Sequence, residues 1–300
     1  MSGPQWIGSC EGVRTSPELI QMLPRTNLSV FRRLAAGTVL LAGAFPLIAR
    51  AQTDSTHTHV DKTFFTRRDA IYSGIALAGS AGISVFDERI ADWTQSSSVQ
   101  GSQSRHDFVN GATHVNETPL TIAAVLTYGV GRLTRSETVT DIGLHASEAM
   151  ILTDVISETI RGPIGRARPR VSQDDQYNFK FWAGFTEFDH RSFPSLHSAS
   201  GFAMAAALSA EIHERNASAA RWASPILYTA ALIPGVTRMY LNQHWASDIV
   251  SGAFVGALIG HKVVRYAHTH KQSKLDRILM GSTVIPDGRG GMLASITLTP

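Results

Sequence analysis

The chain has 300 residues, of which 43% are hydrophobic and 17% are charged, with a net charge of +3 and a mean hydropathy of −0.01. This length allows one large domain or two small ones. The composition lies between that of a typical soluble protein and that of a polytopic membrane protein. The small positive charge suits an anionic ligand, but it is too weak to indicate nucleic acid as a partner.

The N-terminal region predicts a secretory signal peptide over residues 1–51. A Phe-Arg-Arg sequence at 31–33 precedes an apolar stretch that ends in Ala-Arg-Ala at 49–51, the usual order of a signal peptide and its cleavage site. The region before the apolar stretch is unusually long for the N-terminal part of a signal peptide, so Met22 is a candidate for the true start of translation. We expect export to the periplasm or the medium, with an uncleaved membrane anchor as the alternative. Cleavage would remove Cys10, the sole cysteine, and with it thiol catalysis and disulfides.

The first part of the mature chain predicts a polar, flexible leader over residues 52–68, followed by a helix. Asp69 is expected to cap the apolar stretch 70–86. The segment 96–115 is rich in Ser, Gln, Asn and Gly, which favours a loop or short turns. The helical domain is therefore expected to begin at residue 69.

The remaining pattern predicts an all-α fold, a bundle of about six main helices. Five further helical stretches are expected at 117–133, 136–161, 195–214, 218–233 and 242–267. A long connection over 163–194 separates two of them, and connections of that length in compact domains are usually functional. The helical domain is expected to end near residue 280. The tail 281–300 alternates weakly, which favours a short hairpin.

The apolar runs of the mature chain are short for membrane spans. The uncharged runs 70–86, 222–237 and 249–260 contain at most 17 residues and many small side chains, whereas a span needs about 20 apolar residues. They fit the interior of a globular bundle better. We therefore expect a soluble exported domain whose small-residue helices also allow peripheral contact with a membrane.

Three short stretches concentrate basic and nucleophilic side chains. In the first, Arg161 stands at an expected helix end before Gly162-Pro163. Arg166, Arg168 and Arg170 follow at alternate positions, so they share one side if the segment is extended. Such a cluster needs an anion or carboxylates for compensation, although an arginine-rich run is also typical of a solvated loop.

The second and third stretches place histidines at expected helix starts. Ser195 is a natural N-cap with His197 in the first turn, where the N–H groups and the helix dipole attract anions. Asn242 is expected to cap a helix that carries His244 in its first turn. Asp248, four residues later, would hold an imidazole N–H and leave the other nitrogen as a nucleophile. An ordinary capped helix and a structural His–Asp pair are the plainer interpretations.

Together these stretches resemble the signature of the type 2 phosphatidic acid phosphatase superfamily, which includes acid phosphatases, lipid phosphatases and vanadium haloperoxidases. That signature is Lys, six residues and Arg-Pro; then Pro-Ser-Gly-His; then Ser-Arg, five residues, His, three residues and Asp. The corresponding residues here are Arg161, Arg168, Pro169, Pro194, Ser195, Leu196, His197, Thr237, Arg238, His244 and Asp248. Their order and spacing agree throughout. Arg161 departs from Lys, Leu196 from Gly and Thr237 from Ser, and Leu196 would be strained if its position required a positive φ.

The resemblance implies phosphoryl transfer without a metal or other cofactor. His244 would be the nucleophile that forms a phosphohistidine, Asp248 would stabilise its imidazolium, and His197 would be the acid and base. The phosphate-binding residues would be Arg161, Arg168, Ser195, Leu196 and Arg238. The expected enzyme is an exported phosphomonoesterase that acts on a lipid phosphate or a small soluble phosphate.

Two other functions stay open on the sequence. A vanadium haloperoxidase would hold vanadate in the same pocket, with His244 as the ligand and His197 as the acid–base group. A non-catalytic anion-binding protein would result if Leu196 closed the pocket. The pairs His57/His59 and His268/His270 are weak metal signals because no carboxylate or cysteine cluster accompanies them. His145 is expected to be a helix-packing residue, and we expect no metal site.

Overall fold

The computed structural model describes residues 64–270 and the strands at 282–286 and 292–296. The predicted signal peptide, the candidate start at Met22, Cys10 and most of the predicted leader lie outside the described residues. So do His57 and His59.

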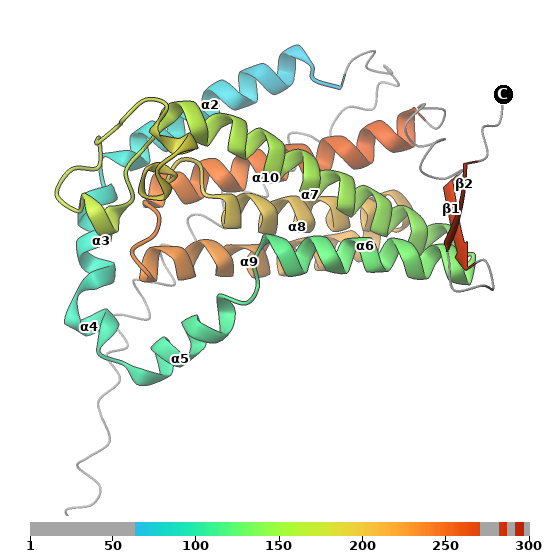
Figure 1. Ribbon diagram of the computed structural model, residues 1–300, viewed down its shortest axis with the longest axis horizontal. Helices are drawn as coiled ribbons and strands as arrows, with labels where there is room; N and C mark the ends of the chain where they lie inside the picture. The colour runs from blue at the N-terminus through green and yellow to red at the C-terminus, as the bar shows by residue number, and fades with distance from the viewer. Residues whose placement is uncertain (1–63, 271–281, 287–291, 297–300) are drawn as a thin grey trace, which may run out of the picture. The chain divides into compact units, whose positions relative to one another are not determined.

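The described residues form an all-α fold, which confirms the predicted fold class (Figure 1). Six long helices are present among them: α2 (Arg67–Ser84), α6 (Glu117–Thr134), α7 (Glu137–Ile164), α8 (Leu196–Arg215), α9 (Ala217–Tyr240) and α10 (Ala246–Thr269). Three shorter helices connect α2 to α6: α3 (Asp87–Gln95), α4 (Ser97–Gln100) and α5 (Gln103–Ala112). The strands β1 (Ser282–Pro286) and β2 (Met292–Ile296) pair antiparallel, with Ser282 opposite Ile296.

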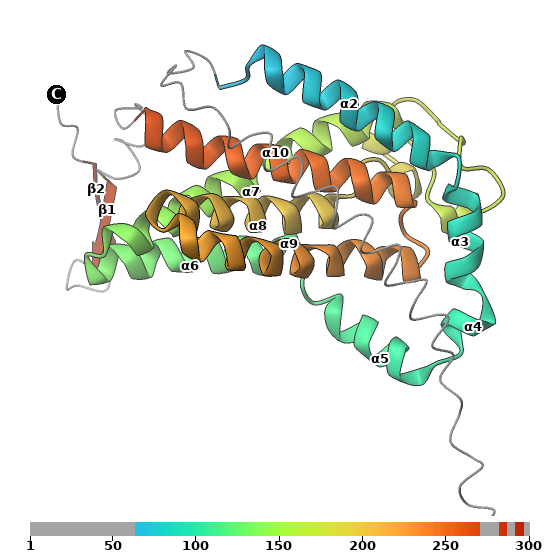
Figure 2. The ribbon, with the colours of Figure 1, turned by 180° about the vertical axis from the view of Figure 1, so that it is seen from behind.

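Helix α8 is the central helix, and it packs against α7, α9 and α10 (Figures 1 and 2). Its contact with α10 is close because glycines recur every fourth residue on α10. A Cβ atom at Gly252 would lie 2.3 Å from the carbonyl oxygen of Ser195, and one at Gly256 would lie 1.9 Å from that of Ala199. The glycines thus bring the two backbones together and set the relative position of the helix starts that carry the motifs.

The first helices differ from the prediction in their boundaries. Helix α2 begins at Arg67, inside the stretch predicted as a leader, because Thr66 is the N-cap. Asp69, predicted to be the cap, is the third residue of α2 and completes a capping box by accepting the Thr66 N–H at 2.7 Å. The segment 96–115 was predicted as a loop or short turns, and it contains the four-residue α4 and the ten-residue α5. Packing decides this region, since Val99 and Val109 are buried with Tyr240.

Helix α7 continues past the predicted break at Gly162-Pro163 and ends at Ile164. A proline in the last turn removes a single hydrogen bond there. Gly165 then terminates the helix, because its φ of 59° and its N–H bond to the Arg161 carbonyl form a left-handed cap. The connection to α8 contains an isolated β-bridge between Arg166 and Phe179 and three short 3-10 turns: η2 (Pro169–Val171), η3 (Ala183–Phe185) and η4 (Phe188–His190).

Candidate active site

The start of α8 has the capped geometry that the sequence predicts. Ser195 is the buried N-cap, and its Oγ accepts the Ser198 N–H at 3.5 Å. Its own N–H donates to the carbonyl of Asp248 at 3.0 Å, which ties α8 to α10. Leu196 is the first residue of α8 and is not among the non-glycine residues with a positive φ. The replacement of glycine by Leu196 therefore carries no backbone strain.

The environment of His244 differs from the prediction. Helix α10 begins at Ala246 with Trp245 as its N-cap, whereas Asn242 stands in the preceding turn with a φ of 55°. His244 therefore precedes the helix and is buried. Its Nδ1 lies 2.8 Å from the backbone oxygen of Ser192 and 3.8 Å from Oδ2 of Asp248. An imidazole whose Nδ1–H donates to a carbonyl keeps its lone pair on Nε2.

Asp248 pairs with His244 at 3.8 Å, beyond hydrogen-bond distance, and makes its hydrogen bonds to the chain around the histidine. Its Oδ2 accepts the Ser192 hydroxyl at 2.6 Å and the Trp245 N–H at 2.9 Å, and its Oδ1 accepts Nη1 of Arg166 at 2.6 Å. Burial would raise the pKa of Asp248, but the Arg166 charge and the hydrogen bonds lower it to about 2. The ionised carboxylate thus fixes both chain segments that flank the histidine.

Arg166 belongs to this structural network, and its partners differ from those of Arg168 and Arg170. Its second guanidinium nitrogen donates to Asp87 of α3 at 2.9 Å. Arg170 instead pairs with Asp189 at the surface. Arg168 and Arg170 nevertheless lie close together, because both guanidinium groups stand over the ring of Phe188, at 4.2 Å and 5.6 Å from its centroid. Sequence reasoning missed Ser192 and Asp87, since neither belongs to a motif.

The three predicted phosphate-binding arginines are all buried or half-buried near the histidines. Arg168 donates to the amide oxygen of Gln243 at 2.6 Å, and its guanidinium lies 4.2 Å from the ring centroid of Phe188. Arg161 donates to the carbonyl of Arg191 at 2.7 Å and to Glu158 at 2.9 Å. Arg238 contacts Nε2 of His197 through Nη2.

These arginines make the site electropositive, and the pKa values of neighbouring groups reflect it. Burial and the charges of Arg161, Arg170 and Arg238 lower the pKa of Arg168 to about 10. Burial and the Arg238 charge lower the pKa of His197 to about 2. Burial lowers the pKa of His244 to about 4. Both histidines are therefore neutral at pH 7 in the absence of an anion.

Glu117 is a further site residue that the motifs do not include. It lies in the first turn of α6, and its Oε2 is 3.5 Å from Nε2 of His197. Three buried side-chain atoms here have no hydrogen-bond partner within the described structure: Glu117 Oε2, His197 Nδ1 and Arg238 Nε. Buried polar atoms without a partner are costly. Their concentration here is expected of a site that binds a polar ligand.

Comparisons with known proteins agree with the resemblance that the motifs show. The model of the PAP2 superfamily matches residues 143–272. The chain is similar to the lipid A 1-phosphatase of Porphyromonas gingivalis, with 42% identity over 69 residues that cover 23% of this chain and 15% of that protein. It is also similar to the lipid A 4'-phosphatase of Bacteroides thetaiotaomicron, with 28% identity over 133 residues that cover 44% of this chain and 54% of that protein.

The matches thus span 15% and 54% of the lengths of these two relatives. Among solved structures, the chain is similar to a transmembrane PAP2 type phosphatidylglycerolphosphate phosphatase from Bacillus subtilis. The TM-score is 0.48 and the identity 17%, over 69% of this chain and 96% of that one. The segment matched by the family model contains every motif residue from Arg161 to Asp248. The match over residues 143–272 therefore agrees with the resemblance to the type 2 phosphatidic acid phosphatase superfamily that the motifs show.

Proposed function

We propose that this protein is a phosphomonoesterase that acts on lipid phosphates through a phosphohistidine on His244. The observation that carries this proposal is the grouping of three arginines around two neutral histidines, one of which has its tautomer fixed by a backbone carbonyl. Arginine binds phosphate oxygens in a planar fork and remains charged. A neutral imidazole with its lone pair on Nε2 is a competent nucleophile.

In the first step, Nε2 of His244 attacks phosphorus and forms a P–N bond as the bond to the leaving oxygen breaks. His197 donates a proton to that oxygen. In the second step, water attacks phosphorus, its proton passes to His197, and the P–N electron pair returns to Nε2. Arg168 and Arg238 would bind the non-bridging oxygens, where charge accumulates in the transition state, and Arg161 would add its charge. No step needs a metal ion.

The protonation of His197 would depend on the substrate. Burial, together with the arginine charges, keeps its imidazole neutral in the free enzyme. A bound phosphate dianion offsets those charges, and Glu117 adds a carboxylate 3.5 Å away. The pKa of His197 would therefore rise when phosphate binds, so that the acid is formed only in the complex.

The molecular surface supports a lipid substrate over a soluble one. Helices α2, α6 and α9 carry many exposed apolar side chains, and Leu133 and Trp222 are 86% and 80% exposed. The others on these helices include Ile71, Ile75, Leu77, Ile122, Val125, Leu126, Val130 and Ile226. A soluble monomer rarely exposes so much apolar surface. This surface counts against the predicted soluble domain and favours association with a membrane.

Within the described residues, α10 is the one single helix long and apolar enough to cross a membrane, and 72% of its apolar window is buried. Helices α2 and α3 satisfy the same criteria as a pair, with a bend of 56° between them. We also propose that the protein is exported across a membrane. This part of the proposal rests on the signal peptide predicted from the sequence, which lies outside the described residues. Fractionation of cells that express the full chain tests both location and membrane association.

The enzymatic proposal is tested by measuring phosphate release from lipid substrates. The assay uses the purified full chain in detergent, with a chelator, near pH 6. Lipid A and phosphatidic acid are the first substrates to compare, because the curated relatives are lipid A phosphatases. We expect His244→Ala to abolish release and His270→Ala, at the exposed end of α10, to retain it. Acid-labile labelling of the wild type alone by a radioactive substrate would support the intermediate.

Equal activity in the wild type and His244→Ala would refute the assigned nucleophile. Hydrolysis of soluble phosphates with no turnover of lipids would refute the lipid substrate. If neither variant released phosphate but the wild type bound vanadate and oxidised halide, the haloperoxidase alternative would replace this proposal.

A further inference from the structure

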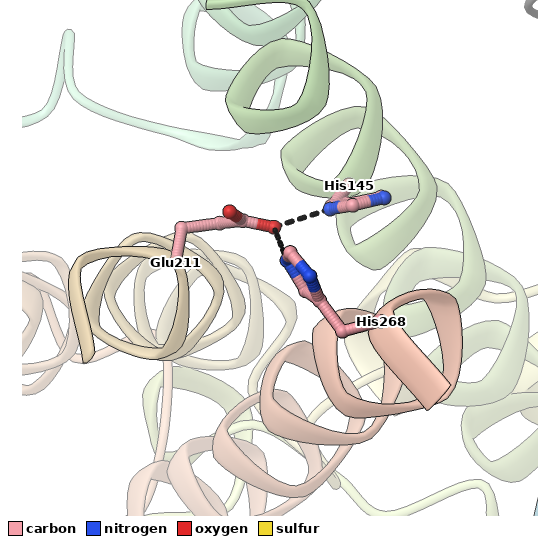
Figure 3. Close-up of side chains that lie close together, drawn as sticks. All are labelled: His145, Glu211 and His268. Atoms are coloured by element: carbon pink, nitrogen blue, oxygen red, sulfur yellow. Dashed lines mark hydrogen bonds and ion pairs between the residues drawn. The ribbon is translucent and has the colours of Figure 1, made fainter. Parts of the chain in front are cut away.

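We propose that His145, Glu211 and His268 form a binding site for a divalent transition-metal ion such as Zn²⁺ (Figure 3). The three side chains come from α7, α8 and α10, whose sequence positions gave no sign that they meet. Each offers one ligand atom, and these atoms lie within 4.8 Å of one another. Two imidazoles and one carboxylate are a ligand set typical of zinc, with a fourth position left for water.

One carboxylate oxygen of Glu211 lies next to both histidine rings. Nδ1 of His145 contacts Oε1 of Glu211, and Nε2 of His268 lies 3.2 Å from the same oxygen. Figure 3 shows both imidazoles directed at Glu211 from neighbouring helices. His145 and Glu211 are buried, whereas the His268 side chain is 24% exposed. An ion can therefore reach the cluster from the side of His268 and find ligands already in place.

The surroundings of Glu211 prepare its carboxylate to bind an ion. Arg215 contacts Oε2 of Glu211 and also donates to Asp141 at 3.0 Å. One carboxylate oxygen is thereby held by the arginine while Oε1 faces the imidazoles. The positive charge of Arg215 is balanced by Asp141, so Glu211 contributes a net negative charge to the cluster. Partners of this kind orient metal ligands and strengthen binding.

The second histidine of the sequence pair takes no part in the cluster. The ring of His270 is stacked on Tyr266 with centroids 4.1 Å apart. His268 instead faces α7 and α8.

The cluster is remote from the candidate active site. His268 follows Asp248 by 20 residues on one helix, which corresponds to about 30 Å at 1.5 Å per residue. A bound ion would therefore not take part in phosphoryl transfer. It would link α7, α8 and α10 at the end of the bundle opposite the motifs, so its effect should appear in stability.

The test uses the untagged full chain, freed of metal and titrated with Zn²⁺ by calorimetry. We expect one tight site in the wild type and an affinity lower by roughly 100-fold in His268→Ala, because a ligand is lost. His270→Ala is the matched control, since it removes a histidine two residues away and should leave the affinity unchanged. Substitution with Co²⁺ should give the visible absorption of a low-coordinate nitrogen and oxygen site in the wild type and in His270→Ala.

A second variant keeps the test informative if His268→Ala does not fold. Arg215→Gln leaves all three ligands in place and removes the group that orients Glu211, so we expect affinity to fall by about 10- to 100-fold. Thermal unfolding should shift upward with Zn²⁺ in the wild type and not in His268→Ala. No tight site in the wild type, or equal binding by the wild type and a folded His268→Ala, would overturn the proposal. The cluster would then be a hydrogen-bonded group only.

Discussion

The Nδ1 atom of His244 donates to the backbone carbonyl of Ser192 at 2.8 Å, and the hydroxyl of Ser192 donates to Asp248 at 2.6 Å. The carboxylate four residues after the histidine therefore acts on it through another segment of the chain. Asp248 holds Ser192, and Ser192 holds the imidazole. This relationship makes Ser192 a positioning residue for the proposed nucleophile.

Ser192→Ala should lower kcat more than it changes KM. The substitution leaves the carbonyl but removes the bond that fixes it, at a cost of about 1–3 kcal/mol in unfolding free energy. Ser198→Ala is the matched control, because its buried hydroxyl donates to the carbonyl of Ile249 at 2.9 Å and does not contact His244. Thermal unfolding and steady-state kinetics separate the two effects. A similar loss of kcat in both variants would contradict a positioning role for Ser192.

The free energy of unfolding should decrease as the pH falls from about 6.5 to about 4. His244 has a lowered pKa of about 4 in the folded protein, against 6.5 for an unperturbed histidine. The unfolded chain therefore binds more protons in this window, and stability rises with pH. The contribution of His244 amounts to about 3 kcal/mol, fully present above pH 6.5.

Thermal unfolding across this pH range measures the effect. His244→Gln should make the slope shallower without abolishing it, because His197 and His261 also have lowered pKa values, of about 2 and about 4. An unchanged slope in His244→Gln would mean that this histidine is not buried in its neutral form.

Binding of an anion to the site should be accompanied by proton uptake. Burial and the arginine charges lower the pKa of His197, and an anion that offsets those charges should raise it again in part. Sulfate is the suitable probe because it does not titrate near neutral pH. Calorimetry in buffers of different ionisation enthalpy should show uptake of up to about one proton per site at pH 6. His197→Asn should bind sulfate with less uptake, and equal uptake would assign the proton elsewhere.

Gly256→Ala should destabilise the bundle by about 1–3 kcal/mol. The added Cβ atom would lie 1.9 Å from the carbonyl oxygen of Ala199, so α8 and α10 would have to separate. Gly129→Ala on α6 is the matched control, because nothing lies within 4 Å of the Cβ position there. That variant should gain about 0.5–1 kcal/mol from helix propensity. Destabilisation of equal size in both would show that close packing is not the cause.

Much of the active-site prediction rests on local patterns. Ser195 is the N-cap of α8 because a serine before a run of helix-forming residues satisfies backbone N–H groups wherever the helix packs. The all-α class follows in the same way from helical periodicity and from the near absence of alternation. The spacing of Arg161, Arg168, His197, Arg238 and His244 was readable because each motif lies within one short segment.

The partners of these residues depend on contacts between segments far apart in the chain. The bond from His244 to Ser192, the pairing of Arg166 with Asp87 and the approach of Glu117 to His197 each join different elements. Spacing predicts neighbours along one helix, but it does not say which other helix lies against it. For the same reason, sequence spacing did not predict the cluster of His145, Glu211 and His268.

The sequence by itself therefore determined the helical class, the capped start of α8 and the residues that carry the proposed chemistry, because these follow from local backbone and motif constraints. The tertiary structure alone decided which carbonyl fixes the His244 tautomer, which arginine is structural and which side chains form the remote cluster. Those features arise from packing, where the close approach of α8 and α10 brings together groups that no local rule connects.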